Sequence, residues 1–337
     1  MIKKTIAGKT TSLKAGFIID PLNSLKAYKD SSVAMMLAAQ KKGWQIHIMV
    51  QDDLYVVDNQ ARATTSRIEL TGNAESEISD WYHITSQQDI SLETLDVIFM
   101  RKDPPFDMEY ISTTYILDLA EARNSLIVNP PASLRDNNEK MFITRFPQCC
   151  TPFLVSRDMQ RLRHFVIERY QQAQQDVILK PLDGMGGASI FRVCPDDPNL
   201  SVILESVTLH GKKTVMAQQF IPEITAGDKR ILMINGEAVP YALARIPSEG
   251  ETRGNLAAGG EGVGVSLTER DKWISTQIGP VLRQQGILFA GIDVIGDYLT
   301  EINITSPTCI RELDKIYQLD IATELMHCIE QKLQQPG

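Results

Sequence analysis

The chain lacks the marks of a membrane or secreted protein. No continuous apolar run approaches the ~20 residues that a helix needs to cross a bilayer. The first sixteen residues carry four lysines and no acid, but they lack the apolar region of a signal peptide and are interpreted as a flexible extension over residues 1–15. The five cysteines show no CxxC spacing, which favours a reducing compartment. We therefore expect a cytoplasmic protein without a membrane partner.

Excess positive charge is also missing. The 34 lysines and arginines stand against 42 acidic residues, for a formal net charge of -8. A protein that neutralises many backbone phosphates has the opposite balance, so nucleic acid is not an expected partner. An anionic ligand must therefore be bound by local basic clusters or by backbone N–H groups.

Several catalytic motifs are absent. The five histidines show no metal-ligand spacing and there is no GxSxG sequence, which gives no support to a histidine-based metal hydrolase or a serine hydrolase. The glycine-rich segments match neither the Walker A pattern nor the GxGxxG dinucleotide fingerprint.

The first part of the chain alternates strand-like and helical patterns. With 337 residues, 43% of them hydrophobic and 23% charged, the chain has room for two or three domains. Apolar strand-like runs and helical periodicity follow one another over residues 16–20, 31–42, 44–50, 96–100, 108–123 and 126–128. This order predicts an open α/β domain over residues 16–130, which ends at the break formed by Asn129, Pro130 and Pro131.

The pattern changes after this break, and we predict a second domain over residues 131–337. Five strand-like runs follow with little helix between most of them, which indicates an antiparallel α+β arrangement; they cover residues 177–181, 189–193, 214–221, 230–235 and 239–246. Residues 247–264 hold six glycines without apolar periodicity and predict a long mobile loop. A helix over about 268–285, strands over 289–295 and 299–305, and a helix over about 321–333 complete the chain.

A lysine followed by a glycine-rich turn is the first candidate site. Lys180 ends an apolar strand, and Gly184, Gly186 and Gly187 come directly after it. Glycines allow backbone N–H groups to face an anion at close range, and the lysine adds a point charge. The pattern favours phosphate binding; a plain hairpin with a glycine-rich turn is the alternative.

Oxygen-bearing side chains on neighbouring strands form the second candidate site. Glu301 and Asn303 share one face of a strand and lie ~6.6 Å apart along it, and Asp293 precedes them on another strand. Such ligands suit Mg²⁺, which takes one or two carboxylates and completes its octahedron with water and phosphates. A half-exposed strand with a polar face is the alternative.

Basic residues gather between these two features. They are Lys229, Arg230, Arg245 and Arg253. Two of them lie at or within apolar strands, where a guanidinium group is costly unless it pairs with an anion. We expect a local positive cluster, and a solvated sheet face is the alternative.

These motifs, in this order, resemble the ATP-grasp enzymes, and the chain resembles the prokaryotic glutathione synthetase family from about Gly16 onward. The matching stretches are residues 29–32, 100–107, 138–140, 180–191, 227–230, 250–260 and 301–312. The resemblance implies an N-terminal α/β domain followed by a two-lobed ATP-grasp fold. Its central lobe would cover about 140–220, its C-terminal lobe about 221–337, and residues 247–264 would form a lid.

The resemblance also implies roles for individual residues. ATP would lie between two sheets, with Mg²⁺ or Mn²⁺ on Asp293, Glu301 and Asn303. Arg230, Arg245 and Arg253 would orient the carboxylate and the acyl phosphate, and Arg101, Ser306 and Thr308 would contact the peptide substrate. The nucleotide would contact Lys140, Lys180, the glycine turn, Gln218, Gln219, Phe220, Ile221 and Asp228.

The activity implied by this family is the ATP-dependent joining of γ-glutamylcysteine and glycine through an acyl phosphate, with release of ADP and phosphate. The family also implies a homotetramer. Two alternatives stay open: a related ATP-grasp ligase for another acid or peptide, and a nucleotide-binding regulatory protein without turnover.

Overall fold

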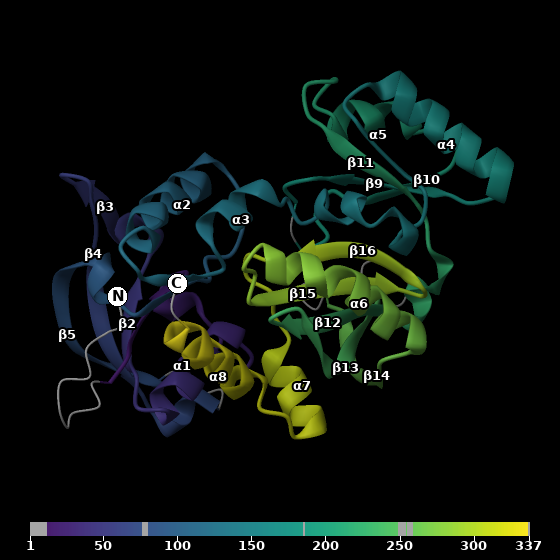
Figure 1. Cartoon of the computed structure of the whole chain (residues 1–337). Helices are drawn as coiled ribbons and strands as arrows, with labels where there is room; N and C mark the ends of the chain where they lie inside the picture. Colours follow the sequence, from purple (N-terminus) through teal and green to yellow (C-terminus); the bar gives the residue numbers. More distant parts are fainter. Residues whose placement is uncertain (1–11, 76–79, 185, 249–253, 255–258, 336–337) are drawn as a thin grey trace.

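A seven-stranded sheet forms the N-terminal part of the molecule (Figure 1). The computed structural model describes residues 12–75, 80–184, 186–248, 254 and 259–335. The strand order is β3-β4-β2-β1-β6-β7, with β5 paired to β4; β1, β2, β6 and β7 are parallel. The strands are β1 (Lys14–Ile18), β2 (Gln45–Met49), β3 (Leu54–Val57), β4 (Gln60–Leu70), β5 (Tyr82–Ser91), β6 (Val97–Met100) and β7 (Leu126–Val128). Helices α1 (Ser31–Lys41), α2 (Met108–Glu121) and α3 (Pro131–Asp136) accompany them. The predicted open α/β fold is confirmed.

Two smaller antiparallel sheets follow, as the antiparallel pattern predicts. The four-stranded sheet has the order β10-β9-β11-β8 and the five-stranded sheet the order β14-β13-β12-β15-β16. Their strands are β8 (Phe153–Ser156), β9 (Val177–Pro181), β10 (Phe191–Val193), β11 (Val215–Gln219), β12 (Asp228–Ile234), β13 (Glu237–Ile246), β14 (Glu261–Ser266), β15 (Phe289–Ile295) and β16 (Tyr298–Asn303). The remaining helices are α4 (Met159–Ala173), α5 (Leu200–Val207), α6 (Glu269–Gln284), α7 (Ile310–Tyr317) and α8 (Ile321–Gln334). In the described part of the chain, no helix is long and apolar enough to cross a membrane.

Two sequence expectations need correction. The first strand begins at Lys14, not Gly16, so the end of the expected extension is structured. The last residues of the expected loop 247–264 belong to β14, which pairs with β13 from Ile246↔Glu261 onward. The glycines of β14 give this strand the composition of a loop, so the sequence did not indicate it. A Cβ on Gly264 would lie 2.7 Å from the ring of Tyr317, and packing therefore excludes a side chain there. The parts 249–253 and 255–258 lie outside the described residues.

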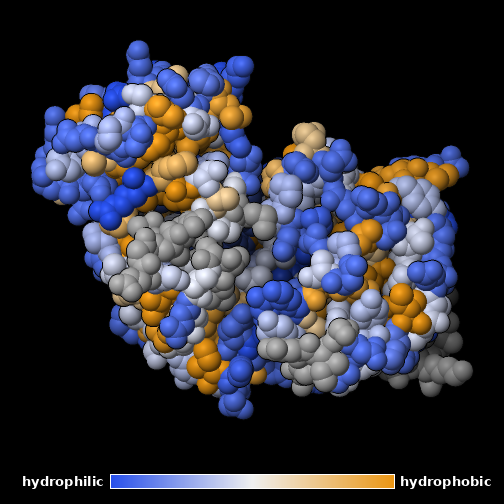
Figure 2. Space-filling model, turned by 180° about the vertical axis from the view of Figure 1, so that it is seen from behind, coloured by the Kyte–Doolittle hydropathy of each residue, from blue (hydrophilic) through white to orange (hydrophobic). Residues whose placement is uncertain are grey.

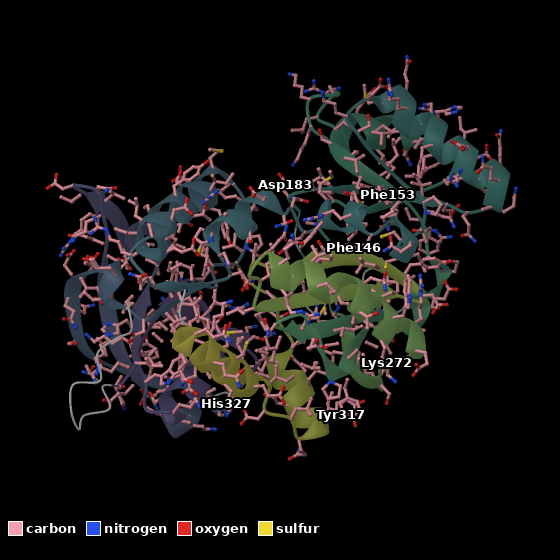
Figure 3. All side chains as sticks on the ribbon, viewed as in Figure 1. Phe146, Phe153, Asp183, Lys272, Tyr317 and His327 are labelled. Atoms are coloured by element: carbon pink, nitrogen blue, oxygen red, sulfur yellow. The ribbon has the colours of Figure 1, made fainter. Side chains whose placement is uncertain are left out.

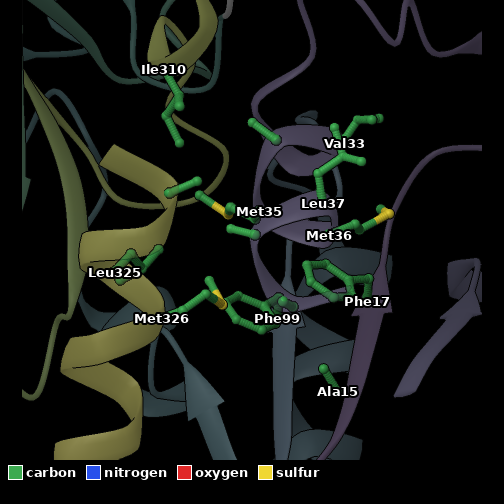
Figure 4. Packing of buried hydrophobic residues seen from close by; sticks show 14 of the residues in the cluster. Ala15, Phe17, Val33, Met35, Met36, Leu37, Phe99, Ile310, Leu325 and Met326 are labelled. Atoms are coloured by element: carbon green, nitrogen blue, oxygen red, sulfur yellow. The ribbon is translucent and has the colours of Figure 1, made fainter. Parts of the chain in front are cut away.

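The last helix returns to the N-terminal sheet. Helix α8 packs against α1 (Figure 1), and Leu325 and Met326 lie in one apolar cluster with Met35 of α1 (Figure 4). Below them Phe17 and Phe99 stack with their ring centroids 4.4 Å apart. The last helix therefore packs against the N-terminal domain, although the sequence prediction places α8 within the second domain.

One asparagine joins the N-terminal sheet to the five-stranded sheet. Asn129, directly after β7, is 3% exposed. Its Nδ2 donates to the carbonyl oxygens of Phe289 and Ile304, both at 2.7 Å. Its Oδ1 accepts from the backbone N–H groups of Leu288 at 3.0 Å and Phe289 at 3.1 Å. Four hydrogen bonds thus fix these two sheets relative to each other.

A buried histidine on β2 predicts a loss of stability in acid. His47 is 4% exposed, and its Nε2 has no hydrogen-bond partner among the described residues. Burial, with Lys14 and Arg67 nearby, lowers the pKa of His47 to about 4 from the ordinary 6.5. Between these values the unfolded chain binds more protons than the folded one, so stability is full above pH 6.5 and falls as the pH drops toward 4.

His47→Gln should therefore flatten this dependence. We expect the wild-type protein to lose up to about 3 kcal/mol more unfolding free energy than the variant between pH 7 and pH 4. Urea unfolding at both pH values measures the difference. His83→Gln, at an exposed position of β5, is the control and should behave like wild type. Equal acid loss in His47→Gln and wild type would show that His47 does not carry the effect.

Candidate active site

A cavity of about 330 Å³ lies where the three sheets meet. Seen from behind, the surface is hollowed between the lobe built on β8–β11 and the rest of the molecule (Figure 2). Side chains from the two antiparallel sheets and from the loop after β6 line it. From the sequence predictions the lining includes Lys140, Lys180, Gly184, Gly186, Gly187, Gln218, Gln219, Phe220, Ile221, Asp228, Arg230, Arg245, Glu301, Asn303, Ser306 and Thr308.

Two buried lysines stand between the glycine turn and β16. Lys180 extends from β9 and donates to Gln218 Oε1 at 2.9 Å and to the carbonyl oxygen of Thr300 at 3.1 Å. Lys140 donates to the carbonyl oxygen of Gly184 at 2.6 Å and pairs with Glu301 at 2.9 Å. Burial lowers the pKa of Lys180 to about 8. A polyanion at this place would stabilise the charged form of both lysines.

The glycine turn adopts a conformation that suits its glycines. Gly186 and Gly187 have φ angles of 61° and 81°, in the left-handed region that is costly for other residues. Asp183, at the start of the turn, pairs with Lys213 at 2.8 Å, and Figure 3 shows it between the four-stranded lobe and the N-terminal domain. The turn can thus present backbone N–H groups to the cavity.

A buried ion-pair cluster lies across the cavity on β12, β13 and β15. Strand register places Arg230 opposite Asp293 and Asp228 opposite Arg245. Arg230 donates to both oxygens of Asp293, at 2.5 and 2.9 Å, and Arg245 reaches the same carboxylate at 2.9 Å and also pairs with Asp228. These contacts provide the anions that two guanidinium groups on apolar strands need.

The pKa values of the two acids are shifted in opposite directions, by burial for Asp228 and by the neighbouring arginines for Asp293. Although burial raises it, Arg230 and Arg245 hold the pKa of Asp293 down at about 2. Burial raises the pKa of Asp228 to about 6 despite the nearby Arg245. Asp293 is therefore firmly ionised, and its charge is balanced by the two arginines.

The oxygen ligands on β16 suit a divalent cation. Glu301 and Asn303 both line the cavity, and the amide nitrogen of Asn303 donates to Asp293 Oδ2 at 3.2 Å and to the carbonyl oxygen of Gly291 at 3.3 Å. Both bonds use the nitrogen, so the amide oxygen is available for a ligand. A carboxylate and an amide oxygen beside bound phosphates meet the preference of Mg²⁺.

Asp293 differs from the other two predicted metal ligands. Both of its oxygens are held by arginines, and it touches the cavity wall through Asn303 without lining the cavity. Among the described residues, no three His, Cys, Asp or Glu side chains are grouped to hold a metal ion by themselves. The two lining ligands therefore need oxygens from bound substrates to complete a magnesium site.

Gln219, Phe220 and Ile221, at and after the end of β11, form another part of the cavity wall. The guanidinium of Arg192 lies over the ring of Phe220, 4.0 Å from its centroid, and the backbone N–H of Phe220 donates to the backbone carbonyl oxygen of Asp176 at 2.9 Å. The buried Nε2 of Gln218 has no hydrogen-bond partner among the described residues. A flat ring with hydrogen-bonding edges fits this part of the cavity.

Comparisons with known proteins agree with this geometry. Residues 139–318 match the family model described as "Prokaryotic glutathione synthetase, ATP-grasp domain", and residues 13–135 match the N-terminal domain of the same family. The chain is 56% identical to glutathione synthetase of Pseudomonas putida over 322 residues, which cover 96% of this chain and 99% of that one. It is 51% identical to the enzyme of Vibrio vulnificus, with 96% and 98% covered.

The chain belongs to the prokaryotic glutathione synthetase family. It is therefore a ligase, and the predicted resemblance is confirmed. Members of this ATP-grasp family use ATP, a divalent metal ion and amino-acid or peptide substrates. The crystal structure of the D-cycloserine synthetase DcsG is similar with a TM-score of 0.67 at 11% identity, covering 95% of this chain and 99% of that one, which shows the fold alone.

One predicted arginine does not line the cavity, and another lies outside the described residues. Arg101 lies behind the wall: it is 5% exposed, and it donates to Ser32 Oγ at 3.1 Å and to the carbonyl oxygen of Pro307 at 2.9 Å. Arg253 lies outside the described residues. The roles of both remain predictions.

Sequence reasoning missed Glu139, which also lines the cavity. One of its oxygens accepts from Thr305 Oγ1 at 2.7 Å and from the backbone N–H groups of Ile304 and Thr305 at 3.2 and 3.3 Å. Glu139 thereby anchors the turn that follows β16. The sequence carries a weak signal for it, since Glu139 lies next to Lys140 in a stretch that matches the family.

Proposed function

We propose that this chain makes glutathione from γ-glutamylcysteine and glycine, with ATP converted to ADP and phosphate. The observation that carries the proposal is one cavity with lysines and a glycine turn on one wall and Glu301 and Asn303 on the other. Full-length similarity to glutathione synthetases supports the choice of substrates.

The first step is transfer of the γ-phosphoryl group to the cysteinyl carboxylate. Lys140 and Lys180 hold the phosphates, and Gln218 to Ile221 bind the adenine. Arg230 and Arg245 orient the carboxylate, one oxygen of which bonds to phosphorus as the bond to ADP breaks. Glu301 and Asn303 would hold a divalent cation, which we propose is Mg²⁺ with Mn²⁺ as a substitute, and the cation would offset the charge that develops as the phosphoryl group leaves ADP.

The second step forms the peptide bond. The amine of glycine attacks the acyl carbon, the new C–N bond forms, and the C–O bond to phosphate breaks. Arg230, Arg245 and Arg253 stabilise the departing phosphate by charge. Water hydrolyses an acyl phosphate readily, so we propose that the part of residues 247–264 that precedes β14 covers the site as a lid.

We further propose the division of the chain that suits this reaction. Residues 16–130 form the substrate domain, 140–220 the central lobe and 221–337 the C-terminal lobe, with α8 returning to the substrate domain. A homotetramer in the cytoplasm is part of the proposal by family similarity.

A coupled assay tests the proposed function. With ATP and Mg²⁺, phosphate release should require both γ-glutamylcysteine and glycine, and one glutathione should form per phosphate. Equal turnover with unrelated acids would favour another ligase activity, and ATP binding without any product would favour the regulatory alternative.

A further inference from the structure

The N-terminal sheet has a switch point that faces the cavity. Strand β1 has β2 on one side and β6 on the other, all parallel. The chain passes from β1 through α1 to β2 and later returns to β6 on the opposite side. In open parallel sheets, ligands bind at the carboxyl ends of the strands at such a point. Asp20 follows β1 there, and Arg101 and Asp103 follow β6.

Two of the three acids near this point are already engaged. Asp20 pairs with Lys102 at 2.8 Å, and Asp30 accepts the N–H of Val33 at 2.9 Å as the cap of α1. Asp103 is different, since no lysine, arginine or histidine nitrogen of the described residues lies within 4.0 Å of its carboxylate. Ser306 hydrogen-bonds this carboxylate, and the charge of Arg101 acts on it at longer range, but no cation of the described residues pairs with it directly.

The backbone of Asp103 is nevertheless fixed from both sides. Its N–H donates to Asp20 Oδ2 at 3.1 Å, and its carbonyl oxygen accepts from Lys102 Nζ at 2.8 Å. Because Lys102 and Asp20 also pair with each other, the three residues form a closed arrangement. It holds Asp103 on the cavity wall, where it is exposed to solvent.

The surroundings of Asp103 suit an ammonium group. Ser306 and Thr308 line the same cavity, and Ser306 Oγ donates to the carbonyl oxygen of Arg101 at 3.2 Å. The guanidinium of Arg101 itself is buried behind this wall. A carboxylate without a direct cation partner, next to two hydroxyl groups, can bind an ammonium group of a ligand.

We propose that Asp103 recognises the α-ammonium group of γ-glutamylcysteine. This inference rests on the proposed function and names a recognition residue for it. Asp103 comes from the loop after β6, whereas Lys180 and Arg230 come from the two antiparallel sheets, so we place the cysteinyl carboxylate beside the lysines and Arg230. The γ-glutamyl end, which carries the ammonium group, then extends to the switch point.

The proposed pair between Asp103 and the α-ammonium group is tested by removing either charge, one by mutation and the other by a change of substrate. The substrate pair is γ-glutamylcysteine and N-glutarylcysteine, in which hydrogen replaces the α-amino group. Asp103→Asn should lower kcat/KM for γ-glutamylcysteine about 10- to 100-fold, the size of one hydrogen bond between charged groups. The same variant should change kcat/KM for N-glutarylcysteine by less than about 3-fold. The loss should appear in KM for the dipeptide, with KM for ATP and glycine unchanged.

Two further variants control the experiment. Asp52→Asn makes the same charge change at an exposed residue outside the cavity lining and should leave both substrates unaffected. Asp103→Glu keeps the charge and should recover part of the loss, and thermal unfolding should show all variants folded. An equal loss on both substrates, no loss on either, or a change in KM for glycine alone would overturn the role of Asp103. No glutathione from the wild-type protein would instead overturn the proposed function, and this role with it.

Discussion

Asn303→Ala should lower kcat by at least ~10²-fold, the order that follows removal of one electrostatic stabiliser. The amide of Asn303 lines the cavity next to Glu301 and donates to Asp293 at 3.2 Å. Alanine removes the oxygen proposed for the metal and the nitrogen that fixes Asp293. The cation that balances the migrating phosphoryl charge is then poorly placed.

Two measurements check this prediction. Steady-state kinetics at saturating Mg²⁺ gives kcat, and Mn²⁺ binding with ADP present, followed by electron paramagnetic resonance, should show weaker metal affinity without any turnover. Asn23→Ala, at an exposed position, is the matched control. Wild-type kcat and metal affinity in Asn303→Ala would refute the metal assignment.

Asn129→Ala should lower the free energy of unfolding by about 4 kcal/mol, because it leaves buried backbone groups without partners at ~1–3 kcal/mol each. These groups belong to Leu288, Phe289 and Ile304, which Asn129 binds with all four of its hydrogen bonds. Alanine cannot replace any of these bonds.

Urea unfolding at neutral pH measures this loss. The Asn23→Ala variant again serves as the control, with an expected change within ~0.5 kcal/mol. A loss of unfolding free energy below ~1 kcal/mol in Asn129→Ala would mean that the hydrogen bonds of Asn129 do not stabilise the contact between the two sheets.

The sequence predicts those strands whose apolar residues form continuous runs. Strands β6, β7 and β15 are buried nearly throughout, so composition alone indicates them. Strand β5 escaped prediction because its side chains are exposed along most of its length, which leaves no alternation. Helix α7 also escaped, since its N-cap Cys309 lies in the left-handed region and gives no side-chain capping signal.

Some residues of the candidate site can likewise be predicted from a local sequence pattern, and others cannot. Lys180 with its glycines, and Glu301 with Asn303, are close in sequence, so a local pattern indicates them. The pairing of Asp293 with Arg230 and Arg245 depends on the register of three strands, which no local pattern contains. Asp103 depends on more distant relations, because Ser306 reaches the backbone of Arg101 across 205 positions.

The central claim is that the cavity transfers a phosphoryl group to the cysteinyl carboxylate of the dipeptide. The direct measurement uses γ-glutamylcysteine labelled with ¹⁸O in that carboxylate, together with ATP, Mg²⁺ and glycine. Since the carboxylate oxygen that attacks phosphorus leaves with it, we predict one ¹⁸O in each phosphate released, detected by mass spectrometry. Phosphate without ¹⁸O, formed together with glutathione, would contradict the acyl-phosphate mechanism.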